Sequence, residues 1–408
     1  MTSASRWEWL DFDEAESRQV RDFLTQDIEG EGVDPLRIGS AVRDRVAEGL
    51  FPGTSTQYTR LRYVLLAPAI LGKKGATIGN IAQHQTALNQ ALGQANPDET
   101  GLIGRRTPTR DFVHLYWTAV RTWKLLTPLT SDRDTTVANG LAAFHLPTAR
   151  DEEGNSLSEH RVTWHPEMVK LAAQFWASSK ASGWPSIHCR QAEVDFLLGQ
   201  WLELPEDSSL AAIASELRRN RPQSGARYPW HMRLPHNGGA RARLERAKGV
   251  SLICWSAQLA YNLALLEAAG KLEAQGVDTT WKLKRNDLDR MRNRIDKLHE
   301  DWKAAFEAEK SMLGPWRDVS CWVDLETSAP REFLASTAGM LIDGKTDLAS
   351  RDWASWVKQR EKVNPAPKLS NTQHLATWSG TPEMAQRWDF RWRACVQRFV
   401  KDAENPRG

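Results

Sequence analysis

Apolar residues recur every three or four positions along most of this chain, which is the spacing of amphipathic helices. Val42, Val46 and Leu50 follow that spacing with charged residues between them, and the same spacing resumes at Tyr58. The Pro52-Gly53 pair between the two runs favours a turn, because proline ends a helix and glycine accepts left-handed backbone. Residues 36–71 are therefore predicted to form a helix-turn-helix-like unit.

The rest of the sequence repeats this helical spacing and shows little of the alternation that is typical of strands. Residues 319–325 form the segment that we expect to be a short strand, and a polar stretch after residue 146 indicates a linker. We predict a mainly α protein of two or three helical domains, with boundaries 1–146, 147–275 and 276–408. Its further helices are expected near residues 7–24, 81–92, 112–126, 166–179, 189–202, 209–219, 249–270, 281–310, 333–342, 351–357 and 384–402.

The helix expected over residues 249–270 is apolar nearly all round, and its length approaches that of a membrane span. Ser251, Ser256 and Asn262 make insertion into lipid less favourable, so we predict a buried core helix and no membrane partner. A buried amide must be hydrogen-bonded, and Asn262 is therefore expected to bond to neighbouring backbone.

The composition is that of a soluble globular protein, with 41% hydrophobic and 26% charged residues in a chain of 408. The four cysteines are scattered without a C-x-x-C pair, so reduced thiols are expected rather than a zinc knuckle or a redox pair. The N-terminus lacks the apolar region of a secretory signal. These features predict a cytoplasmic protein.

The net charge of +3 does not by itself indicate a nucleic-acid partner, but the charge is unevenly distributed. Residues 218–248 carry a single acid, Glu245, among many arginines, with aromatic residues interleaved. Such a stretch supplies phosphate neutralisation and a stacking surface for a nucleic-acid strand. A solvated loop with Trp230 in the core explains the same residues, so two interpretations stay open. The candidate contacts are Arg218, Arg219, Arg221, Arg227, Tyr228, Trp230, Arg233, Arg241 and Arg243.

A second candidate site lies where the second helix of the helix-turn-helix-like unit begins. Thr54, Ser55 or Thr56 can cap this helix, since a hydroxyl accepts from its free N–H groups. Arg60 and Arg62 lie beside its apolar stripe. Hydroxyls, free N–H groups and arginines at one helix start suit an anion such as phosphate. An ordinary capped helix with two solvated arginines explains the same pattern.

Motifs that would identify an enzyme are scarce. The H-x-K, H-E-x-x-H, G-x-S-x-G and kinase patterns are absent from the sequence. Asp343-Gly344-Lys345 has the local form of the (D/E)-x-K of restriction-type nucleases, whose acids hold a metal next to a strand. A chance match explains it unless a sheet surrounds it. His188, Cys189, His231 and His236 lack metal-ligand spacing, so no catalytic, metal or cofactor site is predicted.

The run F-P-G-T-S-T-x-x-T-R-x-R-Y, from Phe51 to Tyr63, resembles the signature of a bacterial family described only as a domain of unknown function. The resemblance implies gene neighbourhoods like those of phage-defence clusters, with helicases and nucleases, and it implies no particular activity. Further blocks that resemble this family extend over almost the whole chain: Trp9-Leu10-Asp11-Phe12, Gly101 to Gly104, Tyr261-Asn262-Leu263, Lys368-Leu369 and Asp389-Phe390-Arg391-Trp392.

Three functions follow as hypotheses. The first is a non-enzymatic nucleic-acid-binding or adaptor subunit of a bacterial defence assembly, with DNA as a ligand ahead of RNA. The second is a protein–protein scaffold whose tryptophan-rich surface docks a helicase or nuclease partner, since tryptophan and arginine are common interface anchors. The third is a metal-dependent nuclease centred near Asp343 and Lys345.

Overall fold

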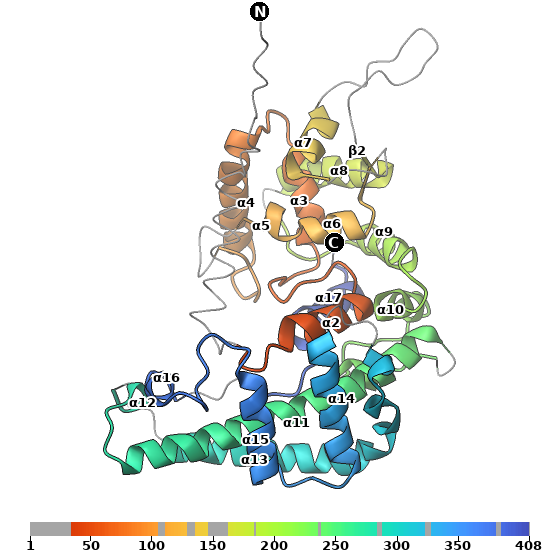
Figure 1. The fold of residues 1–408 in the computed structure, drawn as a ribbon. Helices are drawn as coiled ribbons and strands as arrows, with labels where there is room; N and C mark the ends of the chain where they lie inside the picture. The colour runs from red at the N-terminus through yellow and green to blue at the C-terminus, as the bar shows by residue number, and fades with distance from the viewer. Residues whose placement is uncertain are drawn as a thin grey trace, which may run out of the picture. The chain divides into compact units, whose positions relative to one another are not determined.

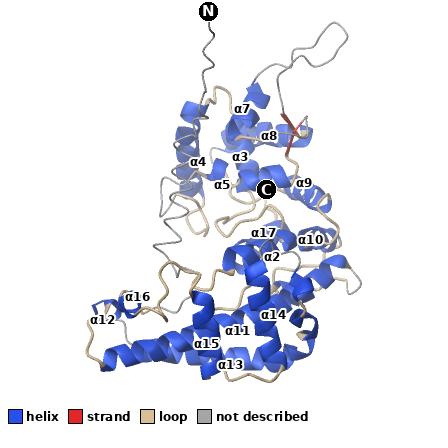
Figure 2. Cartoon of the chain, in the orientation of Figure 1, coloured by secondary structure: helices blue, strands red, loops and turns tan. Residues whose placement is uncertain are grey.

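A computed structural model describes residues 34–104, 111–128, 135–145, 162–182, 185–235, 238–283, 288–322, 328–380 and 385–407. Over these ranges the protein is mainly helical with two short strands, which confirms the predicted fold class (Figures 1 and 2). The helix expected at 7–24, the family block at Trp9 and the residue His236 lie outside the described residues.

The chain divides into two compact units, each discontinuous in sequence. Unit 1 contains residues up to Arg43 and Gly249–Trp388, and unit 2 contains Asp44–Lys248 and the residues from Asp389 onward. The consecutive boundaries at residues 146 and 275 stay a prediction. They differ from these units because the C-terminal segment belongs with residues far earlier in the chain, which hydrophobic spacing does not reveal.

Unit 2 is built around a short, fully buried helix, α3, whose residues are all apolar apart from the Tyr63 hydroxyl. Helix α3 packs on α8 and on α4 to α7, while β1 pairs with β2 antiparallel so that Leu126 faces Trp164. The elements of unit 2 are α2 (Arg45–Leu50), α3 (Tyr63–Leu71), α4 (Ile81–Ala95), α5 (Phe112–Leu115), α6 (Trp117–Thr122), β1 (Leu126–Pro128), α7 (Val137–His145), β2 (Val162–Trp164), α8 (Pro166–Ser182), α9 (Gln191–Leu202), α10 (Ser209–Arg218), the first residues of α11, a π-helix (Trp392–Val396) and α17 (Gln397–Glu404).

Two local expectations in unit 2 are corrected. Helices α2 and α3 are separated by residues 51–62, so the tight turn expected after Leu50 is a longer segment. The single helix expected over 112–126 breaks at Tyr116 into α5 and α6. At that break the Tyr116 hydroxyl accepts hydrogen bonds from the backbone N–H groups of Thr59 and Arg60, at 2.7 and 3.3 Å.

Unit 1 is organised around the long helix α11. Trp302 of α13 donates through Nε1 to the Ser256 hydroxyl at 2.8 Å. The unit contains α11 (Gly239–Ala274) from Gly249 onward, α12 (Thr280–Leu283), α13 (Leu288–Glu309), α14 (Ser328–Ile342), α15 (Arg351–Glu361) and α16 (Thr372–Ala376) (Figure 1). The strand expected at 319–325 is wrong where it is described, because Val319–Trp322 forms a 3-10 helix.

Helix α11 is the helix among the described residues that has the length and composition of a membrane span. In its apolar window 89% of the residues are buried inside the protein, so α11 packs as the predicted core helix. Asn262 is fully buried, and its amide donates to the Gln258 carbonyl at 2.8 Å. The predicted bond to backbone therefore exists, one turn earlier in the same helix.

Candidate nucleic-acid interface

The segment before α3, which carries the predicted anion site, lies largely in the core of unit 2. Helix α3 begins at Tyr63 without a side-chain cap, so Thr54, Ser55 and Thr56 stand well before its first turn. The Thr54 hydroxyl donates to the Phe51 carbonyl at 2.7 Å. The predicted capped helix start is therefore wrong at these three residues, because the chain turns over positions 51–62 before the helix begins.

Arg60 was expected to face solvent, and the structure buries it with 2% of its area exposed. Its Nε donates to both carboxylate oxygens of Asp402, at 3.1 and 3.0 Å. Its Nη1 donates to Glu99 at 2.8 Å, and its Nη2 lies 3.3 Å from Nδ1 of His188. Buried charges require such partners, and here each of the three guanidinium nitrogens has one.

Arg62 is corrected in the same way, with 1% of its area exposed. Its Nη2 donates to Glu193 at 2.6 Å and its Nη1 to the Ser186 carbonyl at 2.7 Å. Its Cζ also lies 5.4 Å from the centroid of the Phe175 ring. Neither arginine has an exposed face for a phosphate, so the expectation that Arg60 and Arg62 face an anion at this segment is corrected.

The signature segment instead packs on other blocks of the family resemblance. Arg391, in left-handed backbone with a φ of 72°, donates to the Thr54 carbonyl and to Glu48 at 3.0 Å. The Tyr63 hydroxyl accepts from the Ile103 N–H at 3.0 Å. Burial raises the pKa of Tyr63 to about 12, so this phenol stays neutral. These residues hold unit 2 together.

Unit 1 shows the same use of the family blocks. The Tyr261 hydroxyl of α11 donates to Glu361 at 2.7 Å. The same buried carboxylate accepts the backbone N–H groups of Lys368 and Leu369, at 2.6 and 2.8 Å. The Tyr261 block and the Lys368-Leu369 block therefore meet at one carboxylate in the core.

The basic stretch after α10 is a loop that the C-terminal residues hold in place. The backbone N–H groups of Gln223 and Ser224 donate to Glu404 of α17, at 2.6 and 2.9 Å. Trp392 donates through Nε1 to the Ala226 carbonyl at 2.8 Å. Because its backbone is bonded to Glu404 and Trp392, the loop presents its side chains at defined positions.

Exposed arginines cover this anchored loop. The Glu216 carboxylate, 1% exposed, pairs with Arg219 at 3.0 Å and with Arg221 at 3.2 Å. Arg393 of the C-terminal π-helix pairs with Asp389 at 2.6 Å, and more than 40% of its side chain is exposed. In all three pairs the carboxylate is the more buried partner, while about half or more of each arginine side chain is exposed to solvent, where a second anion can reach it. We call the following exposed residues the guanidinium surface: Arg218, Arg219, Arg221, Arg227, Arg233 and Arg393.

Two predicted contact residues are instead structural. Arg241 is half-buried and pairs with Glu245 at 2.5 Å. Arg243 pairs with Asp207 and donates to the Gly49 carbonyl at 2.9 Å. Arg241 stands in the first turn of α11 and also donates to the Trp230 carbonyl at 3.2 Å. Arg243 follows in the second turn, and its partners join the start of α11 to α2 and to the loop after α9.

The aromatic residues of the loop do not form an open stacking surface. Trp230 is 3% exposed, so the structure places it in the core. The Tyr228 ring stacks on Trp230 with centroids 5.0 Å apart and an interplanar angle of 6°. Arg227 and Arg393 lie over the Tyr228 ring, with Cζ at 5.6 and 5.4 Å from its centroid. The exposed planar groups here are the guanidinium groups and the His231 imidazole, and of the two interpretations of Trp230 the structure shows the core position.

Sequence reasoning missed the residues that assemble this surface. Arg393 is separated from Tyr228 by more than 160 positions, and no local pattern links the two. Glu216 reads in the sequence as one more polar residue of α10, although its buried carboxylate holds two arginines. The sequence alone does not show that Glu216 is buried, so it could not identify Glu216 as the residue that positions Arg219 and Arg221.

The nuclease-like tripeptide stands in a different setting from the one a nuclease needs. Asp343 directly follows α14 and pairs with Arg317 at 2.9 Å, while Lys345 pairs with Asp352 at 2.8 Å. The segment before Asp343 is a helix, so the strand on which that hypothesis depended is absent there. Among the described residues no group of three His, Cys, Asp or Glu side chains is arranged to hold a metal ion.

Comparison with known proteins places the chain in a family. No curated protein and no solved structure matches it. A family of unknown function, DUF6361, matches residues 4–405, which is nearly the whole chain. The protein therefore belongs to the family of unknown function DUF6361.

Proposed function

We propose that this protein binds nucleic acid through the guanidinium surface, as a non-enzymatic subunit of a cytoplasmic bacterial defence assembly. The observation that carries the proposal is the set of six exposed arginines on and beside one anchored loop. The guanidinium group matches the oxygens of a phosphate and stays charged at any physiological pH. A loop held by Glu404 and Trp392 loses little freedom when it binds.

The defence role rests on the family resemblance, and with it the expectation of a helicase or nuclease as protein partner. DNA is the nucleic acid to test ahead of RNA. In such an assembly this chain would bind the nucleic acid through the guanidinium surface, and the helicase or nuclease partner would act on it.

The test is a binding titration at several salt concentrations with a labelled oligonucleotide. The variant combines Arg218→Gln, Arg227→Gln and Arg233→Gln, because replacing Arg219 or Arg221 would unpair the buried Glu216. Each lost phosphate contact should flatten the slope of log K against log salt by about 0.7 to 0.9, so the triple variant should lose roughly 2 to 3.

A matched control combines Arg292→Gln, Arg294→Gln and Arg351→Gln, which are exposed arginines of unit 1. It changes the net charge equally but should keep the parent salt slope. Equal slopes for the parent and the Arg218, Arg227 and Arg233 variant would show that the loop is only solvated.

The two alternatives have weaker support than the nucleic-acid proposal. Every tryptophan among the described residues is buried or half-buried, so the tryptophan-rich docking surface of the scaffold hypothesis is missing from that part of the chain. The nuclease hypothesis required a strand before Asp343, and a helix stands there.

A further inference from the structure

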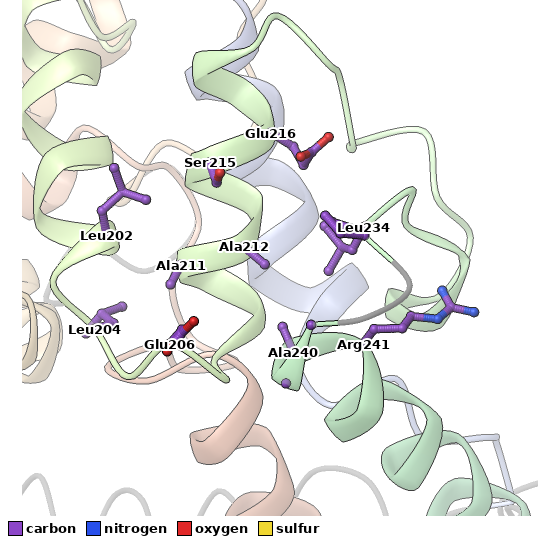
Figure 3. Close-up of a pocket in the computed structure, with 13 residues that line it drawn as sticks. Leu202, Leu204, Glu206, Ala211, Ala212, Ser215, Glu216, Leu234, Ala240 and Arg241 are labelled. Atoms are coloured by element: carbon purple, nitrogen blue, oxygen red, sulfur yellow. The ribbon is translucent and has the colours of Figure 1, made fainter.

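A cavity of about 350 Å³ opens in unit 2 beside the guanidinium surface. Three segments line it: the end of α9 with the loop after it, one side of α10, and the start of α11 with the residues before it (Figure 3). Gly239 at the start of α11 allows this closeness, because a Cβ there would lie 2.9 Å from Cβ of Asp207. The cavity walls therefore belong to elements that are packed together.

The cavity and the guanidinium surface share residues and neighbours. Glu216 lines the cavity, and its carboxylate holds Arg219 and Arg221. Leu234 lines it too, directly after Arg233 in the chain. A nucleotide carries its base and its phosphate on one sugar, so a phosphate on these arginines would bring its base to the cavity.

The lining has the character of a site for a flat heterocycle. Leucine, alanine, proline and glycine form most of the wall, with a few polar groups among them, as in small-molecule sites. Ser215 of α10 offers a hydroxyl that donates or accepts, and Glu206 offers carboxylate oxygens that only accept (Figure 3). An acceptor group favours bases with an exocyclic amine over thymine and uracil, which have none.

We infer that this cavity receives one unpaired base of a single-stranded nucleic acid whose phosphates lie on the guanidinium surface. The inference rests on the proposed function and specifies its ligand. A base inside a duplex is stacked and paired, and extruding it costs a few kcal/mol, so a single strand occupies the cavity more readily. The arginines also stand mostly on a loop, whereas groove readers present a helix or a two-stranded ribbon to duplex DNA.

The experiment compares labelled single strands of equal length: oligo-dC, oligo-dT, the abasic backbone, and a dC–dG duplex. The parent should bind oligo-dC roughly ten- to a hundred-fold more tightly than the abasic strand, and more tightly than oligo-dT or the duplex. Ala212→Leu fills the cavity from α10 and should remove the advantage of oligo-dC over the abasic strand, leaving the salt slope unchanged (Figure 3).

The control is Ala91→Leu, the same substitution at a half-buried site on α4 outside the cavity, which should bind as the parent does. If Ala212→Leu has a lowered melting midpoint, Glu206→Gln replaces it in the experiment, because Glu206 is exposed and tolerates the change. Loss of the Glu206 carboxylate should reduce the preference for oligo-dC over oligo-dT. Equal parent affinities for oligo-dC and the abasic strand overturn the cavity inference while the proposed function stands. If no strand binds at low salt, both fail.

Discussion

The buried Arg60 offers a measurable test of whether the family signature serves the fold or a ligand. Arg60→Met keeps the length of the side chain and removes the charge. Asp402 then stays buried with one remaining hydrogen bond, from the Leu61 N–H at 3.0 Å. Removing one partner of a buried ion pair costs about 3–5 kcal/mol, because it leaves an uncompensated charge. For a domain of 150–250 residues, each kcal/mol shifts the melting midpoint by about 2–4 °C.

A double variant shows whether the stability lost in Arg60→Met comes from the uncompensated charge of Asp402. Asp402→Asn in the Arg60→Met background removes the stranded charge and keeps an oxygen for the Leu61 N–H. The double variant should therefore regain part of the lost stability, which no sum of two independent losses would do. Thermal melting and urea titration, followed by far-ultraviolet circular dichroism, measure each variant. Arg121→Met on the exposed face of α6 is the control and should stay within about 0.5 kcal/mol of the parent.

Two results would refute this reasoning. One is an Arg60→Met midpoint equal to that of the parent, which would mean that the contacts to Asp402 and Glu99 contribute nothing. The other is a parent-like midpoint combined with lost nucleic-acid affinity, which would return Arg60 to the ligand site that the sequence predicted for it.

Two further predictions concern unit 2. Gly53→Ala should destabilise it by about 2–4 kcal/mol, since Gly53 has a φ of 75° and a Cβ would lie 2.7 Å from Cβ of Thr122. Gly75→Ala has the same backbone strain with nothing within 4 Å, so calorimetry should show a loss of only about 1 kcal/mol. Burial, together with the charge of Arg60, lowers the pKa of His188, so the folded state binds its proton less readily than the unfolded state. The folded state is therefore at its most stable, as far as His188 is concerned, above about pH 6.5, and it loses stability as the pH falls below that value. His188→Gln removes this dependence and should narrow the difference between the melting midpoints at pH 7.5 and pH 5.5. An unchanged difference would contradict the assignment.

Hydrophobic spacing predicted the fold class and an unbroken apolar run predicted the central helix, because both are local features of the sequence. The run of residues 249–270 is apolar all round, and only burial or a membrane accommodates such a helix. The break between α5 and α6 could not be predicted from the sequence. Tyr116 interrupts its helix at a hydroxyl that bonds to backbone 56 and 57 positions earlier, which is a tertiary contact. The three-residue strands β1 and β2 are too short for alternation to be visible.

Arg60 and Arg62 were predicted to be exposed, and both errors have the same cause. An arginine in the sequence reads as exposed, since arginine is almost never fully buried unless it is paired. Arg60 and Arg62 are paired with Asp402 and Glu193, and no pattern reveals a partner so distant in sequence. The loop arginines were predicted to be exposed, and they are, because their local setting, irregular and nearly free of acids, was informative by itself.

The family blocks and the proposed ligand surface are different residues with connected roles. Trp392 belongs to the C-terminal block, packs 6.0 Å from Phe51 of the signature, and donates to the Ala226 carbonyl of the basic loop. Arg393, the next residue, lies over Tyr228 in the same loop. The core contacts that the family blocks supply thus fix the backbone on which the exposed arginines stand. The family motif therefore supports the proposed binding surface, and the proposal places the ligand contacts at the exposed positions next to it.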